Sequence, residues 1–238
     1  MTLLRSFLFA IWFVVATIFI YVAVFPALLL PRIAMVQASR LWSRVVFLGL
    51  KVFAGLTYEV RGEIPRGPVL VASKHMSMWD TMALYLILYD PAAVLKRELL
   101  RVPFYGWYIW KAGVIPVDRG GYASALRKMT SAAKQALQQG RPLLIFPEGT
   151  RKKPDAPPDY KPGVAGLYSQ LNVACIPVAL NSGLFWTGPM GFIKKPGRIV
   201  VEFLDPIPPG LKRTEFMQLL QQRIEGATAG LIAESPAA

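Results

Sequence analysis

The stretch PVLVASKHMSMWDT, residues 68–81, decides the fold class that this sequence predicts. Its short apolar run, residues 69–71, is typical of a buried strand, and the residues that follow are polar and turn-prone. The next run, TMALYLIL, has the pattern of a helix. A buried strand, a polar turn and a helix therefore follow one another here.

The alternation of strand and helix patterns continues from residue 57 onward. The predicted strands are 58–61, 69–72, 93–95, 114–117, 143–146, 174–179 and 198–203. Helical patterns lie between several of them, most clearly over 122–139, where Gly140 and Pro142 supply a stop signal. This alternation predicts an α/β fold with a mixed, largely parallel sheet flanked by helices. A further helix is expected over 214–225, and no functional signal is found after residue 204.

The first 56 residues are expected to attach this domain to a membrane. Residues 7–30 carry no charge, and at about 1.5 Å per residue a helix of that length is long enough to span a bilayer. Trp12, Tyr21 and Pro26 would also permit a tilt, a kink or a hairpin that re-enters one leaflet, so anchoring is better supported than spanning. A cleaved signal peptide is the alternative, although its apolar region is normally shorter. Residues 36–56 mix basic and apolar side chains, as in an interfacial helix or a core helix with one solvated face. We therefore expect N-terminal membrane-anchoring helices over 1–56 and a catalytic domain over 57–238.

Composition narrows the choice of partner. The formal net charge of +13 implies anionic partners, and a hydrophobic content of 54% favours lipid over nucleic acid. The sequence has one cysteine, Cys175, and one histidine, His75, so neither an intramolecular disulfide nor a zinc-like ligand set is expected. Cys175 lies in an apolar run and is interpreted as a core residue.

Basic residues near the apolar segment predict its orientation. If residues 7–30 span the membrane, the basic residues after the span outweigh Arg5 before it: Arg32, Arg40, Arg44 and Lys51. Because cytoplasmic flanks carry the excess of Lys and Arg, this bias predicts a catalytic domain on the cytoplasmic side of the inner membrane.

The one histidine stands at the turn of the opening stretch, five positions before Asp80. A neutral imidazole accepts a proton from a hydroxyl, and a carboxylate bonded to its other nitrogen fixes the tautomer. The two side chains would lie on different faces of a regular helix, so their contact requires a turn before the helix. The alternative is a structural histidine with Asp80 as a helix N-cap, and the bare spacing alone favours that alternative.

A second group of polar residues follows the apolar run PLLIF. Gly149 allows a ligand to approach the backbone, while Thr150 and Arg151 offer a hydroxyl and a guanidinium suited to phosphate oxygens. The alternative is an ordinary turn with solvated charges. Loops after strand ends in an α/β sheet converge on one edge, which adds three basic candidates: Lys96, Arg119 and Lys161.

Taken together, these blocks resemble the glycerolipid acyltransferase family, specifically the bacterial 1-acylglycerol-3-phosphate O-acyltransferases. The resemblance covers roughly residues 58–204, and the apolar N-terminus fits it. The family's H-x4-D block matches His75 and Asp80, its second block matches residues 113–119, its P-E-G-T-R block matches residues 147–151, and its short apolar block matches residues 176–178. One departure is Lys74, which replaces the asparagine that often precedes the family's histidine.

The resemblance implies a reaction. His75, oriented by Asp80, would take the proton from the sn-2 hydroxyl of lysophosphatidic acid as that oxygen attacks an acyl thioester, giving phosphatidic acid. The donor would be acyl-CoA or acyl carrier protein, with no cofactor and no metal. The acceptor's phosphate or nearby polar groups would be held by Lys96, Arg119, Glu148, Gly149, Thr150, Arg151 and Lys161. Because a carboxylate does not pair with a phosphate anion, Glu148 is expected to orient a basic neighbour or bind a hydroxyl.

Three alternatives remain open at this point. The acceptor could be another lysolipid, such as a lyso-aminolipid or an already substituted lysophospholipid, and the change at Lys74 bears on that choice. The same dyad could instead activate water and hydrolyse the thioester. A non-catalytic membrane-anchored module that binds anionic lipid head groups would use the same basic loops.

Overall fold

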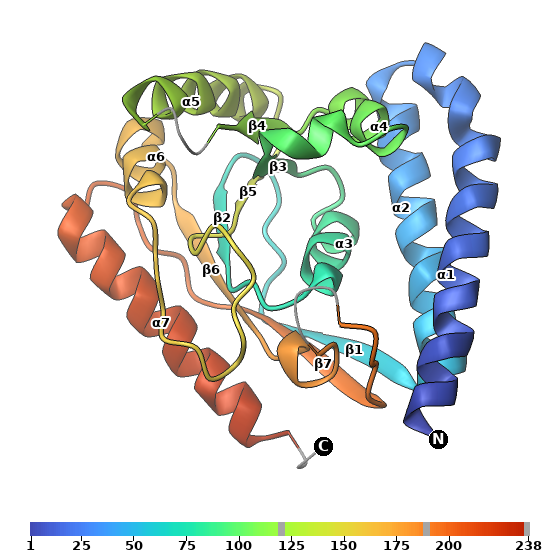
Figure 1. Ribbon diagram of the computed structural model, residues 1–238. Coiled ribbons are helices and arrows are strands. Elements are labelled where there is room, and N and C mark those ends of the chain that lie inside the picture. Colours follow the sequence, from blue (N-terminus) through green and yellow to red (C-terminus); the bar gives the residue numbers. More distant parts are fainter. Residues whose placement is uncertain (119–121, 188–190, 236–238) are drawn as a thin grey trace.

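A seven-stranded sheet forms the centre of the protein (Figure 1). It is seen in a computed structural model, in which residues 1–118, 122–187 and 191–235 are described. Every predicted strand is present, with ends within two residues of those expected; the strands are β1 (Leu56–Arg61), β2 (Leu70–Ser73), β3 (Ala92–Lys96), β4 (Ile115–Val117), β5 (Leu143–Ile145), β6 (Cys175–Leu180) and β7 (Gly197–Phe203).

The strand order is β1-β7-β6-β2-β5-β3-β4. All neighbouring pairs run parallel except β6 and β7, so the predicted mixed, largely parallel sheet is confirmed. The central strands β2, β5 and β6 are buried along their whole lengths. Helices cover both of their faces, which is why these strands are near-continuous apolar runs in the sequence.

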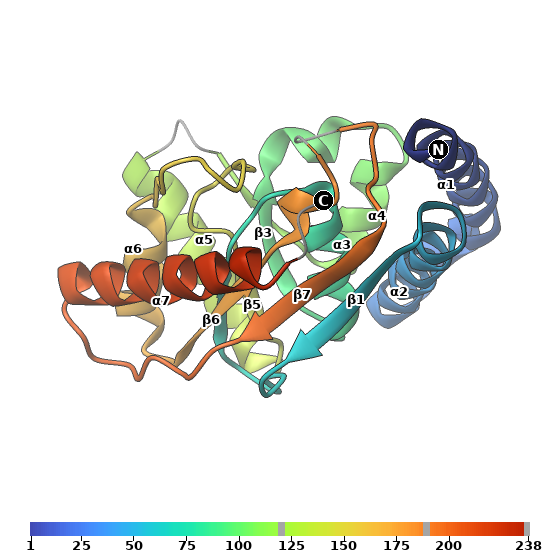
Figure 2. The ribbon, with the colours of Figure 1, turned by 90° about the horizontal axis from the view of Figure 1, so that it is seen from below.

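Two layers of helices enclose the sheet. Val71 of β2 faces a core shared with α1 (Thr2–Val24), α2 (Arg32–Gly49) and α3 (Met78–Ile87). Its neighbours Leu70 and Ala72 face the opposite core, which is shared with α5 (Tyr122–Gln138), α6 (Gly163–Leu171) and α7 (Arg213–Ala233). Figure 2 shows α7 extended along the sheet on this second side, where it contacts β6. The side chains of successive residues of β2 therefore point to opposite helix layers.

The N-terminal residues form an antiparallel helical hairpin (Figures 1 and 2). Helix α1 ends at Val24, a short 3-10 segment (Phe25–Leu29) that contains Pro26 makes the turn, and α2 returns before a π-helical turn (Leu50–Ala54). The segment Thr2–Leu29 is long and apolar enough to cross a membrane, with mean hydropathy 2.7 and only 11% of its most apolar window buried. The outward face of α1 is apolar; it exposes Leu3, Leu4, Phe7, Ile11, Val14, Val15, Ile18, Phe19 and Val22.

Helix α2 lies between α1 and the sheet domain, and it has one buried face. Val46 and Phe47 enter the core beside Trp79, while Arg44 and Lys51 are exposed. Arg40 is turned inward instead, where it donates to the Leu86 carbonyl oxygen at 2.6 Å. This arrangement agrees with the core-helix alternative with a solvated face.

The short helix α4 (Tyr105–Ala112) connects β3 to β4 by way of a 3-10 turn (Arg97–Arg101) and packs against α2. Tyr108 donates to the backbone oxygen of Tyr21 at 2.7 Å, which ties α4 to the hairpin. Since Phe9 and Phe47 share a core with Trp79, the hairpin rests directly on the α/β domain. The proposed division at residues 56 and 57 stays a prediction, and β1 begins at Leu56.

The hairpin depends on a close approach that can be tested at Gly49. A Cβ atom added there would lie 2.1 Å from Cδ1 of Trp12, whose indole N–H donates to the Val45 carbonyl oxygen at 3.0 Å. Overpacking typically costs about 1–3 kcal/mol, so we expect Gly49→Ala to lower the melting temperature in detergent by several degrees.

Gly226 of α7 is the matched control, because among the described residues no atom beyond its own helix turn lies within 4 Å of a Cβ added there. Gly226→Ala is expected to leave the melting temperature unchanged or to raise it, since alanine is the better helix former. Melting is measured by circular dichroism. Equal melting temperatures for Gly49→Ala and the wild type would contradict the packing of α1 on α2.

Candidate active site

The sheet order brings the predicted site residues together. Strands β6, β2 and β5 are neighbours and parallel, so the residues that follow them emerge at one edge. Ser182 follows β6, His75 follows β2, and the loop 147–151 follows β5. Strand β3, which ends at Lys96, is the next neighbour. This is the edge at which parallel α/β sheets commonly bind ligands.

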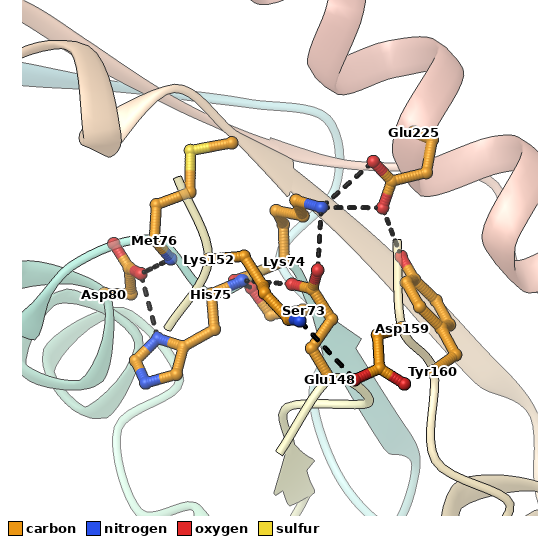
Figure 3. A network of polar contacts seen from close by, with 10 residues as sticks. All are labelled: Ser73, Lys74, His75, Met76, Asp80, Glu148, Lys152, Asp159, Tyr160 and Glu225. Carbon is orange, nitrogen blue, oxygen red and sulfur yellow. Dashed lines mark hydrogen bonds and ion pairs between the residues drawn. The ribbon is translucent and has the colours of Figure 1, made fainter. Parts of the chain in front are cut away.

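His75 and Asp80 form the predicted pair. The imidazole Nδ1 lies 2.9 Å from Asp80 Oδ2, and the contact is buried. It is possible because α3 begins only at Met78, so His75 precedes the helix that carries Asp80. Figure 3 shows the other ring nitrogen, Nε2, on the side of the imidazole away from Asp80. When Nδ1 carries the proton and donates it to Asp80, Nε2 is the basic nitrogen of the ring.

The Asp80 carboxylate also fixes the start of α3. Its Oδ2 atom accepts from the backbone N–H groups of Met76 at 2.7 Å and Ser77 at 2.9 Å. Ser77 is the N-cap, and Asp80 completes a capping box from the third helical position. Asp80 is therefore not the N-cap residue, as the alternative expected, but the third helical residue of the capping box. Its side chain both caps the helix and contacts His75.

Ser182 is a functional candidate that sequence reasoning missed. Its buried hydroxyl donates to Asp80 Oδ1, and Ser77 Oγ lies 2.9 Å away from it. Both carboxylate oxygens of Asp80 are thus hydrogen-bonded. The signal that could have found it is the one used for Lys96, because Ser182 lies two residues after the end of β6.

The loop after β5 holds His75 from two directions. The Phe146 ring stacks on the imidazole with centroids 3.9 Å apart. Glu148 Oε2 lies 3.4 Å from the His75 backbone N–H, and the Lys152 N–H donates to the His75 carbonyl oxygen at 2.9 Å. The His75 backbone is therefore positioned by the segment that contains the P-E-G-T-R residues.

Glu148 orients a basic neighbour, and that neighbour is Lys74. The Lys74 ammonium lies 2.9 Å from Glu148 Oε1, and both side chains are 1% exposed. Burial raises the pKa of the Glu148 carboxyl, while the bond to Lys74 opposes the rise. Glu225 of α7 supplies a second carboxylate to Lys74, at 2.8 Å, and accepts from the Tyr160 hydroxyl at 2.9 Å (Figure 3). The sequence gives no signal for Glu225, because its contact spans 151 residues.

The remaining described candidates, grouped here as the rim residues, are all more exposed than Glu148. Gly149 has φ +65°, a left-handed conformation that favours glycine, and Thr150 is exposed. Lys96 is about half exposed and lies 3.6 Å from Glu98, and Lys161 pairs with Asp159 at 2.8 Å. Arg151 is half-buried on the same loop. Arg119 falls outside the described residues.

Comparison with known proteins places the chain in a family. A family model described as Acyltransferase matches residues 56–181, more than half of the chain. The chain belongs to this acyltransferase family. The match begins at β1 and ends just after β6, so it contains His75, Asp80 and the loop after β5.

Individual acyltransferases extend this result. The chain is 37% identical over 162 residues to a 1-acyl-sn-glycerol-3-phosphate acyltransferase of Pseudomonas aeruginosa, covering 67% of this chain and 63% of that protein. It is 30% identical over 202 residues to a lyso-ornithine lipid O-acyltransferase of the same organism, covering 77% of each chain. The crystal structure of the 1-acyl-sn-glycerophosphate (LPA) acyltransferase PlsC from Thermotoga maritima shares the fold, with TM-score 0.79, 22% identity and coverage of 99% of this chain and 100% of that one. The chain spans less than two thirds of the length of the 1-acyl-sn-glycerol-3-phosphate acyltransferase of Pseudomonas aeruginosa.

Within this acyltransferase fold the apolar block 176–178 has a structural role. It lies in β6, where Ile176 and Val178 enter the core and Pro177 is the register partner of Ala72. Cys175 is fully buried at the start of the same strand, and burial raises the pKa of its thiol. Because the thiolate is the reactive form, Cys175 is unsuited to nucleophilic catalysis.

Cys175 should be inert in the folded protein. We expect N-ethylmaleimide at pH 8 to leave the native chain unmodified and to label it once after denaturation, as measured by intact mass. A protonated, inaccessible thiol explains both results. Stoichiometric labelling of the folded chain would contradict the burial of Cys175 and would reopen the question of a covalent intermediate.

Proposed function

We propose that the protein transfers an acyl group from an acyl thioester to the sn-2 hydroxyl of 1-acylglycerol-3-phosphate, giving phosphatidic acid in phospholipid biosynthesis. The observation that carries this proposal is the His75 Nδ1 contact with Asp80 Oδ2 at 2.9 Å, which leaves Nε2 as a base. Membership of the acyltransferase family and the names of the relatives support the reaction class.

The chemistry follows from the dyad. Nε2 of His75 takes the proton of the acceptor hydroxyl while that oxygen attacks the thioester carbonyl carbon. The tetrahedral intermediate then collapses, the C–S bond breaks, and the departing sulfur receives the proton from the imidazolium. Asp80 stabilises the imidazolium without becoming protonated. Coenzyme A or acyl carrier protein leaves as the thiol, and no acyl-enzyme forms.

Basic groups near the same edge of the sheet bind the anionic part of the acceptor. Arg151 follows β5 and Lys96 ends β3, one strand further along. Guanidinium groups pair with phosphate oxygens in two-point geometry, and an ammonium contributes a point charge. Arg119 follows β4 in the sequence, and Lys161 comes ten residues after Arg151. Both are assigned to the same phosphate-binding role. Gly149 and Thr150 supply close backbone approach and a hydroxyl.

The helical hairpin brings this site to the membrane. The apolar outer face of α1 would otherwise be exposed to water over most of its length. Arg44 and Lys51 remain exposed on the returning arm, which favours the cytoplasmic leaflet of the inner membrane. A single-chain lipid then reaches His75 with its head group while its tail stays in an apolar environment.

A second candidate acceptor is a lyso-ornithine lipid. The relative of that name is less identical, but it aligns over more of both chains than the glycerol-3-phosphate enzyme does. The dyad chemistry is the same for either acceptor hydroxyl. The two acceptors differ in their polar groups, so the choice between them depends on the rim residues and not on His75.

Removal of the base tests the mechanism. General-base catalysis typically contributes about 10²–10⁴-fold, so His75→Ala should lower the turnover of labelled acyl thioester by at least that factor. Asp205→Asn, at an exposed carboxylate, is the control for a polar change in the same domain. Circular dichroism establishes that each variant is folded. Turnover of His75→Ala near that of the wild type would rule out the proposed mechanism.

An acceptor panel tests the reaction and its substrate together. Purified protein in detergent is given acyl-CoA or acyl carrier protein thioester, alone and with lysophosphatidate, a lyso-ornithine lipid or another lysophospholipid. We expect thioester consumption only with an acceptor, fastest with lysophosphatidate, and phosphatidic acid as product. Faster turnover of the lyso-ornithine lipid would select the second candidate. Free fatty acid as the main product would indicate hydrolysis, and no consumption at all would favour a lipid-binding module.

A further inference from the structure

We infer that the C-terminal helix α7 belongs to the machinery that positions His75, through a chain of charges that runs from the partly exposed Glu225 to the buried Lys74 and Glu148. Lys74 and Glu225 are thus positioning residues for the proposed acyl transfer, and this inference rests on that function for its kinetic consequences. Lys74 and Glu225 lie on the side of β2 opposite the His75 imidazole, and neither is among the residues proposed to bind substrate.

The alternation of side chains along β2 explains how two adjacent residues serve different layers. Val71 faces the core beside α3, and Leu70 and Ala72 face the core beside α7. Continued past Ser73, the same alternation directs Lys74 toward α7 and His75 toward α3. Figure 3 shows this divergence, with the Lys74 ammonium at Glu225 and the imidazole at Asp80.

Lys74 is held as a fully paired buried cation. Its ammonium lies 2.9 Å from Glu148 Oε1, and 2.8 Å and 3.0 Å from the two oxygens of Glu225. A lysine that is 1% exposed needs such partners, because an unpaired buried ammonium is strongly disfavoured. Glu148 alone would give one partner. Glu225, whose side chain is 27% exposed, supplies the second and is itself held by the Tyr160 hydroxyl.

The network reaches His75 through its backbone. Glu148 binds Lys74 with one carboxylate oxygen and faces the His75 N–H with the other, at 3.4 Å. The Lys152 N–H holds the His75 carbonyl oxygen from the other side. Displacement of Glu148 therefore moves the peptide from which the imidazole projects. Misplacement of a catalytic group by about 1 Å can cost 10²-fold in rate.

The arrangement accounts for the residue at which this chain departs from the family's pattern. A neutral asparagine before the histidine would need no second carboxylate. With lysine there, charge pairing requires an acid from another part of the fold, and α7 provides it. The C-terminal region thereby becomes part of the site although it contributes no group to the reacting atoms.

The test combines kinetics with the one histidine resonance of the full-length protein in detergent. The variants are Lys74→Met, Glu225→Gln, their double variant, Tyr160→Phe, and Glu215→Gln as an exposed control on the same helix. We expect kcat to fall about 100-fold in Lys74→Met and about 10-fold in Glu225→Gln, with little change in KM for lysophosphatidate, because the base is displaced and the head-group contacts are not. Tyr160→Phe should show a smaller loss, and Glu215→Gln none.

Coupling between the sites separates positioning from general damage. Glu225→Gln should lower kcat much less in the Lys74→Met background than in the wild type, because the lysine through which it acts is gone. Additive losses, or losses that match the fraction of unfolded protein, would overturn the inference. If Lys74→Met does not fold, Glu225→Gln alone decides, and wild-type kcat in that variant would also overturn it.

A structural measurement keeps this inference distinct from the proposed function. His75 is the only histidine, so a histidine 13Cε1 label reports on this one ring. At one fixed pH the resonance should move in Glu225→Gln and Lys74→Met and stay in place in Glu215→Gln. If the wild type transfers no acyl group but the resonance moves as expected, the proposed function fails and the positioning network stands. An unmoved resonance in both variants would contradict the network whatever the activity.

Discussion

The carboxylate of Asp80 is the acceptor on which the rest of the site depends. It receives hydrogen bonds from the His75 ring, from two backbone N–H groups at the start of α3, and from the Ser182 hydroxyl. His75 follows β2, Asp80 lies in α3, and Ser182 follows β6. The hydrogen bonds to this buried carboxylate fix the helix start and orient the His75 ring.

The same region shows how the sheet order creates the site. Because β2 lies between β5 and β6, the loop after β5 contacts the His75 backbone from one side while Ser182 contacts Asp80 from the other. The P-E-G-T-R loop thus has an inner and an outer part. Glu148 faces inward to Lys74, and Thr150 is exposed at the rim. One short segment therefore contacts the His75 backbone and also carries residues proposed to bind the acceptor.

The strands could be predicted because β2, β5 and β6 are covered on both faces and so must be apolar throughout. The His75 and Asp80 pair could be predicted because it is local, and its geometry is set by a turn and a helix start. Ser182 and Glu225 were missed because their contacts span 102 and 151 residues. Lys74 was recognised as unusual, but its two acidic partners follow only from the alternation of β2 and the path of α7.

The tautomer of the His75 ring is set by its contact with Asp80 and can be measured. With 15N-labelled histidine, the two-bond 1H–15N correlations of the folded protein report which nitrogen carries the proton, and a single histidine makes the assignment unambiguous. We predict a protonated Nδ1 that faces Asp80 and an unprotonated Nε2 in the neutral ring. A proton on Nε2 in the neutral ring would contradict this prediction, because the nitrogen proposed as the base would then have no lone pair to offer.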